Sequence, residues 1–166
     1  MDKIIFFLIV VILLSCKSKI KVDEAIKGLK IEYNAFITYD FNTNSIYVEI
    51  DSFKYIDSLI LTDEDLNKLS KSFNESKISK IKGERWYSDN NMSFPADVIV
   101  LKFYYENKIR SEVIISRKMK LKSSIDSDRI VLFKDLLLDI FQRNEKIQKA
   151  LEISYKKQEE TNNILY

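Results

Sequence analysis

The stretch VIVLKFYYENKIRSEVIIS, residues 98–116, decides the fold because it predicts a β-hairpin together with its register. Two apolar-rich runs, 98–105 and 109–116, flank the polar residues 106–108. A three-residue loop pairs Phe103 with Ser111, Leu101 with Val113 and Ile99 with Ile115. The same register sets Lys102 opposite Glu112, which is a favourable cross-strand pair. The apolar face and the charge pair therefore indicate the same hairpin register.

A second group of strands is predicted nearer the amino terminus. Apolar and polar residues alternate from Ile31 to Phe41 and are interrupted only at Phe36, which predicts one half-buried strand. Turn formers fill 42–45 before the next alternating run, 46–51. A four-residue loop pairs Phe41 with Ile46, Tyr39 with Val48 and Ile37 with Ile50. A two-residue loop also keeps one apolar face, whereas a three-residue loop mixes the faces, so the register stays open.

One helix is predicted between the two strand groups. Residues 53–61 are expected to form a strand that leads into it. Thr62 is the expected N-cap, with Asp65 in the capping-box position and Leu61 and Leu66 as a hydrophobic staple. The acidic residues here are therefore interpreted as helix-capping rather than catalytic groups.

A long carboxy-terminal helix is predicted from Ser127 or Asp128 onward. Its apolar residues follow helical spacing, with polar Asn144 in the remaining position of the same stripe: Ile130, Phe133, Leu137, Ile140, Ile147 and Leu151. We expect this stripe to pack on the sheet; a coiled-coil partner is the alternative. The polar chain beyond Tyr155 is expected to fray. The predicted class is α+β: an antiparallel sheet of two hairpin groups, one intervening helix and a long C-terminal helix.

The first residues of the chain are typical of an export signal. Lys3 precedes an apolar run from Ile4 to Leu14, which spans 11 residues and ends at Ser15. A helix that spans a bilayer needs about 20 apolar residues, so this run predicts a cleaved signal peptide rather than a membrane span.

The residues Leu13, Leu14, Ser15 and Cys16 resemble the lipobox of bacterial lipoprotein precursors, although Leu14 is larger than is usual at that position. The resemblance implies cleavage between Ser15 and Cys16, and acyl chains such as palmitate on Cys16. Lys17 is not the aspartate that retains many lipoproteins at the inner membrane, so the expected location is the periplasmic face of the outer membrane. An ordinary secretory signal or an uncleaved anchor is the alternative.

These segments give the predicted organisation of the chain. Residues 1–15 are the signal peptide, 16–30 a lipidated tether, 31–155 a single α+β domain and 156–166 a polar tail. Removing the signal peptide leaves the formal charge at +2, because Asp2 and Lys3 leave together. The mature chain is long enough to bury a core without disulfide or metal staples.

Composition excludes several classes of site. The chain has no histidine and a single cysteine, so histidine-based nucleophile systems and zinc sites of imidazole and thiolate lack their residues. Gly28 and Gly83 are the only glycines, which excludes a glycine-rich phosphate-binding loop. Because basic and acidic residues are nearly balanced, the sequence shows no basic stripe of the kind that binds nucleic acid. We expect no cofactor and no metal.

The most unusual segment is 83–95, which holds the only tryptophan and the only proline. Its side chains are of types enriched in protein interfaces, which makes it a candidate partner-binding loop: Arg85, Trp86, Tyr87, Met92 and Phe94. In the alternative interpretation, Trp86 and Phe94 pack into the core and 89–91 form a hairpin tip.

Three functions are compatible with the sequence. The first is a lipid-anchored, non-catalytic domain that binds an envelope protein or a cell-wall component. The second is a lipid-anchored immunity or inhibitor protein that acts against a toxin or a lytic enzyme. The third is a carboxylate-dependent enzyme acting on envelope glycan, for which Asp57, Asp89 and Asp97 are candidate acids near strand ends or loops.

Overall fold

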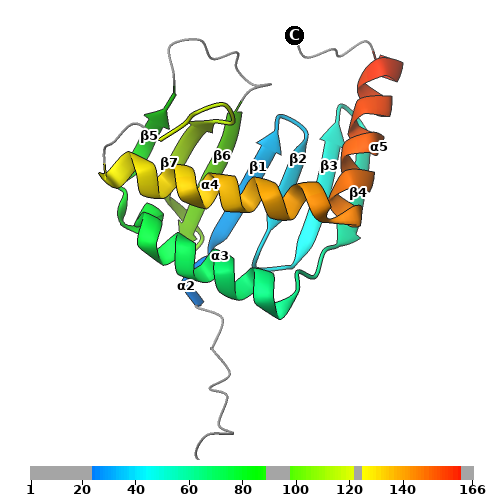
Figure 1. The fold of residues 1–166 in the computed structure, drawn as a ribbon. Coiled ribbons are helices and arrows are strands. Elements are labelled where there is room, and N and C mark those ends of the chain that lie inside the picture. Colours follow the sequence, from blue (N-terminus) through cyan, green and yellow to red (C-terminus); the bar gives the residue numbers. More distant parts are fainter. Residues whose placement is uncertain (1–23, 89–97, 122–124, 162–166) are drawn as a thin grey trace, which may run out of the picture.

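The computed structural model describes residues 24–88, 98–121 and 125–161, which form a seven-stranded sheet with helices on one face (Figure 1). In chain order the elements are α2 (Glu24–Lys27), β1 (Leu29–Asn34), β2 (Ile37–Asp40), β3 (Ser45–Ile50), β4 (Phe53–Ser58), α3 (Asp63–Ser76), the 3-10 helix η1 (Ile78–Lys80), β5 (Gly83–Tyr87), β6 (Val98–Tyr105), β7 (Lys108–Ser116), α4 (Ile125–Arg143) and α5 (Glu145–Thr161). The strand order is β4-β3-β2-β1-β6-β7-β5. This arrangement confirms the predicted α+β class.

The β6–β7 hairpin has the predicted register. Phe103 pairs with Ser111, Leu101 with Val113, Ile99 with Ile115 and Lys102 with Glu112. The connection is a two-residue turn, Glu106 and Asn107, rather than a three-residue loop. Both turn residues have positive φ, 50° and 60°, as the tight hairpin turn of type I′ requires. Arg110 is the extra residue of a β-bulge. This bulge offsets the shorter turn, so the pairs from Phe103–Ser111 onward have the predicted register.

The predicted single strand over 31–41 is wrong, because the chain reverses within it to form β1 and β2. The side-chain oxygen of Asn34 accepts hydrogen bonds from the backbone N–H groups of Phe36 and Ile37, at 2.9 and 2.8 Å, and so closes the turn. Ile31 pairs with Tyr39 across it. Odd-numbered residues therefore face the core on both strands, and the alternation passes through the turn unchanged.

The β2–β3 hairpin keeps the predicted apolar face with a different register. Tyr39 pairs with Ile46 and Ile37 with Val48, two residues away from the pairing expected for a four-residue loop at 42–45. The loop does have four residues, but they are 41–44. Phe41 leaves the β2–β3 ladder, and its backbone N–H donates instead to the carbonyl of Leu29 at 3.2 Å.

Helix α3 begins as the sequence predicts. The side-chain oxygen of Thr62 accepts a hydrogen bond from the backbone N–H of Asp65 at 3.1 Å. The buried Asp65 carboxylate also accepts a hydrogen bond from Arg143 of α4 at 2.7 Å. The capping acid therefore joins the two helices as well, and it is a structural group rather than a catalytic one.

The predicted helix from residue 127 is two helices, α4 and α5, separated at Asn144. The side-chain oxygen of Asn144 accepts from the backbone N–H groups of Lys146 and Ile147, at 3.1 and 3.3 Å, so it caps α5. The side chain of Gln148 donates to the carbonyl of Phe141 at 2.8 Å and satisfies the end of α4. Helix α4 crosses the sheet beside α3, and α5 turns to run along β3 (Figure 1).

Helix α5 continues beyond the expected fraying point at Tyr155. It ends at Thr161, and Gln158 is buried with its amide donating to the Ser154 hydroxyl at 2.9 Å. The Lys157 ammonium lies 5.0 Å from the centre of the Phe53 ring of β4. Polar and cationic contacts of these kinds hold the last turns, and hydrophobic periodicity does not reveal them.

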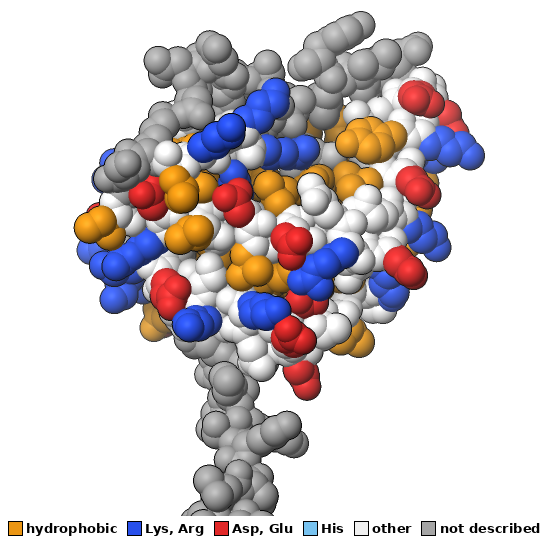
Figure 2. Space-filling view, in the orientation of Figure 1, with side chains coloured by type: hydrophobic (Ala, Val, Ile, Leu, Met, Phe, Trp, Pro, Cys, Tyr) orange, Lys and Arg blue, Asp and Glu red, His pale blue; other side chains and the backbone are white. Residues whose placement is uncertain are grey.

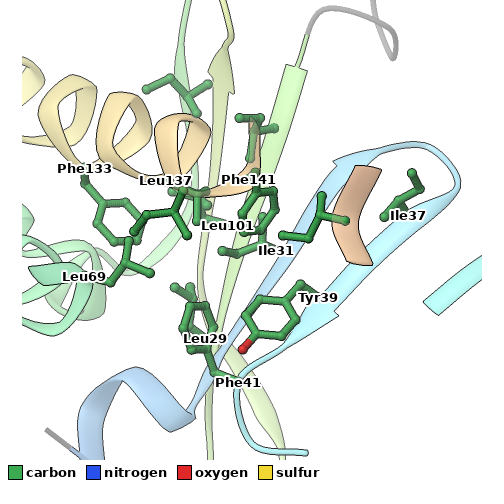
Figure 3. Packing of buried hydrophobic residues seen from close by; sticks show 14 of the residues in the cluster. Leu29, Ile31, Ile37, Tyr39, Phe41, Leu69, Leu101, Phe133, Leu137 and Phe141 are labelled. Carbon is green, nitrogen blue, oxygen red and sulfur yellow. The ribbon is translucent and has the colours of Figure 1, made fainter. Parts of the chain in front are cut away.

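The main core lies between the sheet and the helices. Figure 3 shows α4 residues Phe133, Leu137 and Phe141 pointing toward strand residues that include Ile31 and Tyr39. The ring centres of Tyr39 and Phe141 are 6.1 Å apart in an edge-on arrangement. The apolar stripe of the predicted C-terminal helix therefore packs on the sheet of its own domain. Within the described ranges, no helix is long and apolar enough to cross a membrane.

Candidate functional site

The two faces of the sheet differ in what covers them. Side chains of the main core point toward α3, α4 and α5, and the outer side of these helices carries interspersed basic and acidic residues (Figure 2). The opposite face, called here the open face, carries the alternate residues of each strand. The described helices all pack on the first face. Among the residues that the structure describes, a site on the open face would therefore be built from strand residues.

The predicted partner-binding loop begins as a strand rather than a loop. Residues 83–87 form β5, the last strand in the sheet order, which pairs in parallel with β7. Arg85 pairs with Val113 and Tyr87 with Ile115, which places both on the helix-covered face. Met92 and Phe94 lie outside the described residues. The described candidates are thus divided between two faces, because successive strand residues point in opposite directions.

Trp86 lies on the open face and is 50% exposed. Its ring nitrogen donates a hydrogen bond to the carboxylate of Glu84, two residues earlier on the same face. It occupies the register position beside Ile114 of β7, which pairs in turn with Val100 of β6. The interpretation that Trp86 packs into the core is therefore wrong; the corresponding prediction for Phe94 concerns a residue that the structure does not describe.

A small second apolar cluster lies beneath this position. Val98, Val100 and Ile114 are buried and form a group separate from the main core. The first half of strand β6, residues 98–101, is therefore apolar on both faces. Trp86 is thus a half-exposed aromatic side chain at the sheet edge, next to buried apolar residues. We call Glu84, Trp86, Val100, Glu112 and Ile114 the Trp86 surface.

A charged group borders the Trp86 surface. The Lys102 ammonium lies 2.5 Å from a Glu32 carboxylate oxygen and 3.9 Å from one of Glu112. Burial would lower the pKa of Lys102, but the hydrogen bond to Glu32 and the charge of Glu112 outweigh it and raise that pKa. Lys102 is therefore fully charged at neutral pH, and the group has one cation between two anions. With Glu84, this border is acidic.

Tyr87, on the other side of β5, has a structural role. Its ring packs against the main core, and burial raises the pKa of its hydroxyl group. The positive charge of Arg85 lowers that pKa, and the negative charge of Asp126 raises it. Tyr87 therefore stays protonated at neutral pH and contributes packing on the helix side of the edge strand.

The carboxylate candidates do not form a described catalytic pair. Asp57 accepts hydrogen bonds from Lys146 at 3.2 Å and from the Tyr55 hydroxyl at 3.1 Å, and these lower the pKa of its carboxyl group. An acid held ionised in this way is poorly suited to donate a proton. Asp89 and Asp97 lie outside the described residues. Among the described residues, acidic and cysteine side chains form no group of three suited to hold a metal ion.

Comparisons with known proteins do not identify a relative: no protein-family model, curated protein or solved structure matches the chain.

Sequence patterns contained a signal for the second cluster. The run Val98, Ile99, Val100, Leu101 is apolar at four successive positions, which is typical of a strand buried on both faces. The parallel partner β5 had no comparable signal. After Gly83 its residues are charged or aromatic. In the described part of the chain it pairs with β7, about 28 positions farther along.

Proposed function

We propose that the mature chain is a lipid-anchored envelope domain that binds another envelope protein and has no catalytic activity. The observation that supports binding is the half-exposed Trp86 beside a buried apolar cluster at a sheet edge. The lipobox-like residues support the anchor, with Cys16 carrying the acyl chains after cleavage at Ser15. The proposed location is the periplasmic face of the outer membrane.

Interface energetics favour Trp86 as the anchor of this surface. Tryptophan is among the residues most enriched where a few side chains dominate binding energy, and such anchors usually fill pockets ringed by polar groups. Glu84 and Glu112 provide polar groups beside Trp86. Because Lys102 sits between two acids, we expect the partner to present basic side chains around an apolar or aromatic pocket.

The outer edge of β5 offers a second means of recognition. In the described part of the chain β5 pairs with β7 alone, so its other edge carries backbone donors and acceptors that an extended partner segment can use. Backbone pairing there would place a partner strand directly beside Trp86. Edge pairing and the aromatic anchor would then act on the same segment of the partner.

The membrane anchor is tested on protein from the native host. Mass spectrometry of the amino-terminal peptide should find Cys16 as the first residue, carrying acyl chains. Cys16→Ser should leave the precursor uncleaved at this bond and without acyl chains. An unmodified Cys16 in the mature protein would contradict the anchor.

Partner binding is tested by photo-crosslinking in the same host. A photoreactive phenylalanine analogue at position 86 should give one discrete crosslinked protein. The matched control carries the analogue at Ile56, which is 63% exposed on the open face at the opposite edge strand, β4. Equal products from both positions, or none from position 86, would contradict a partner site at Trp86. A crosslink to cell-wall material alone would contradict a protein partner.

Intrinsic fluorescence then measures the interaction with the captured partner. Trp86 is the only tryptophan, so its emission should shift to shorter wavelength as the ring leaves water. Trp86→Ala should weaken binding by at least about tenfold, which corresponds to roughly 1.4 kcal/mol. Ile56→Ala should leave the affinity unchanged.

A further inference from the structure

We propose that the end of the sheet at the β6–β7 turn is a membrane-contact surface that lies against an anionic bilayer. We call this surface the turn end and define it by Lys27, Tyr105, Lys108, Ile109 and Arg110. The proposal rests on the proposed lipid anchor, because the anchor is what holds the domain near the bilayer. It is separate from the Trp86 surface and takes a different ligand.

The chain enters the domain at the turn end. The backbone N–H of Tyr104 donates to the carbonyl of Gly28 at 2.7 Å, so the segment after α2 is bonded to the last residues of β6. A Cβ added to Gly28 would lie 2.6 Å from the Tyr104 carbonyl oxygen, so glycine permits this close approach. Figure 1 shows α2 at the same end of the sheet as this turn.

The length of the preceding segment limits how far this end can lie from the lipid. Eight residue steps separate Cys16 from Glu24, where α2 begins. At full extension they reach at most about 28 Å. Acyl chains on Cys16 would therefore keep the start of α2 within that distance of the headgroups, and the turn is bonded to the segment that follows α2.

The exposed side chains at the turn end suit a bilayer interface. Tyr105 is 56% exposed and Ile109 is 50% exposed, and they belong to the last two cross-strand pairs before the turn, Tyr105 with Lys108 and Tyr104 with Ile109. The tip therefore presents an aromatic side chain on one face and an aliphatic side chain on the other. Tyrosine is enriched at headgroup level in membrane proteins because its ring is apolar and its hydroxyl is polar. The Arg110 guanidinium lies 5.6 Å from the centre of the Tyr105 ring, so a cation accompanies the aromatic group.

The charge of the turn end favours anionic headgroups. Lys27, Lys108 and Arg110 are exposed cations, and Glu106 is the exposed anion at the turn. Lys30 is paired with the buried Asp40 at 2.9 Å and adds no net charge. Such a surface is attracted to anionic lipid within about one Debye length, roughly 8 Å at physiological salt.

Contact at this end would leave the partner surface accessible. Trp86 is level with Val100 in the sheet register, five residues along β6 from Tyr105. At about 3.3 Å per residue this is roughly 17 Å from the tip. Trp86 would therefore lie above the headgroups while the turn end touches them.

The experiment measures the depth of single residues in vesicles that carry the mature lipidated protein. Variants Y105W and I56W, each with W86F, have one tryptophan at the turn end or at the opposite edge strand. The vesicles contain phosphatidylcholine and phosphatidylglycerol. A fraction of the lipid carries bromine on its acyl chains, which quenches the fluorescence of a nearby tryptophan. We expect Y105W/W86F to lose emission, and I56W/W86F and the native chain with Trp86 to keep it.

Two comparisons separate charge from simple proximity. Vesicles of phosphatidylcholine alone, or the added changes K108Q and R110Q, should restore emission in Y105W/W86F, and high salt should do the same. Flotation of the protein with the vesicles tests the anchor independently. Protein that fails to float would overturn the anchor, and with it the proposal. Protein that floats, while the two reporter positions are quenched equally or not at all, would overturn the membrane-contact surface alone.

Discussion

The helix-covered face and the open face of the sheet use the same strands for different purposes. On β7, Ile115 points into the main core and Ile114, its neighbour, points into the three-residue cluster below Trp86. The covered face is buried by α3, α4 and α5, whereas the open face carries ion pairs such as Lys102 with Glu32. Strand alternation thus separates the residues that stabilise the fold from those available to a partner.

This difference implies that the two faces tolerate substitution differently. A methyl group lost in the main core leaves a cavity that packed helices and strands cannot easily fill. The open-face cluster has three residues, and its register neighbours include the charged side chains of Lys102 and Glu112, so a polar replacement there has polar groups nearby.

Phe133→Ala should produce the largest loss of stability. Phe133 is fully buried, and its ring centre lies 5.8 Å from that of Phe73, so the substitution removes a contact between α4 and α3. We expect the free energy of unfolding to fall by about 3–5 kcal/mol, measured by urea denaturation. Leu132→Ala, at an exposed neighbouring position of α4, should change it little. Equal losses would contradict the assignment of the core face.

Ile115→Thr and Ile114→Thr form a matched pair on one strand. The new hydroxyl at position 115 would be buried in the main core, at a cost of about 2–3 kcal/mol. At position 114 the same change should cost about 1 kcal/mol, because the site lies near polar side chains. Urea denaturation of the two variants measures the difference. A larger loss at position 114 would reverse the proposed roles of the faces.

Asn144→Ala tests the junction that lets both C-terminal helices cover one face. The substitution removes the side-chain cap of α5 and should cost about 1 kcal/mol. Asn144→Asp should retain most of the stability, since aspartate caps helices equally well. Thermal unfolding followed by circular dichroism measures both. If the alanine variant were as stable as the native chain, the cap would not determine the break.

Tyr39→Phe should change the alkaline stability of the covered face. Burial, helped by the negative charge of Asp40, raises the pKa of Tyr39 above the value of about 10 for exposed tyrosine. The unfolded chain releases this proton near pH 10 and the folded chain retains it, so the free energy of unfolding falls as pH rises further. Tyr39→Phe should make this fall shallower. Tyr155→Phe, at an exposed position, should leave it unchanged.

Sequence periodicity predicted the register of the β6–β7 hairpin, but it missed the β1–β2 turn and gave another register for β2–β3. The β6–β7 register followed from one apolar face and the Lys102–Glu112 pair, and both are present. Periodicity could not locate the turn at Asn34. Odd-numbered residues pair with odd-numbered residues across this turn, so the apolar and polar residues alternate as they would in one continuous strand. It also passed over the break at Asn144, where a polar residue occupied a position in the apolar stripe. The preference of asparagine for helix N-caps was the available signal.

The candidate site was predicted by residue type and not by geometry. Trp86 was selected because tryptophan is common in interfaces, and its exposure agrees with that choice. The separation of Trp86 from Tyr87 could not be foreseen, since a loop prediction carries no alternation. Whether β5 forms depends on a pairing with β7 across a long stretch of chain, and local propensity does not encode such contacts. The lipid anchor stays a prediction from the amino-terminal residues.

The pairing of β1 with β6 has a consequence for the order in which the chain folds. Leu29 pairs with Phe103, so the two hairpin groups are joined by strands roughly 70 residues apart. Because the amino terminus emerges first, β1 would wait for a partner that lies roughly 70 residues behind it. During that interval its backbone edge would be exposed to other chains, which is a route to aggregation. Newly made protein would therefore depend most on chaperones after β4 has formed and before β6 arrives.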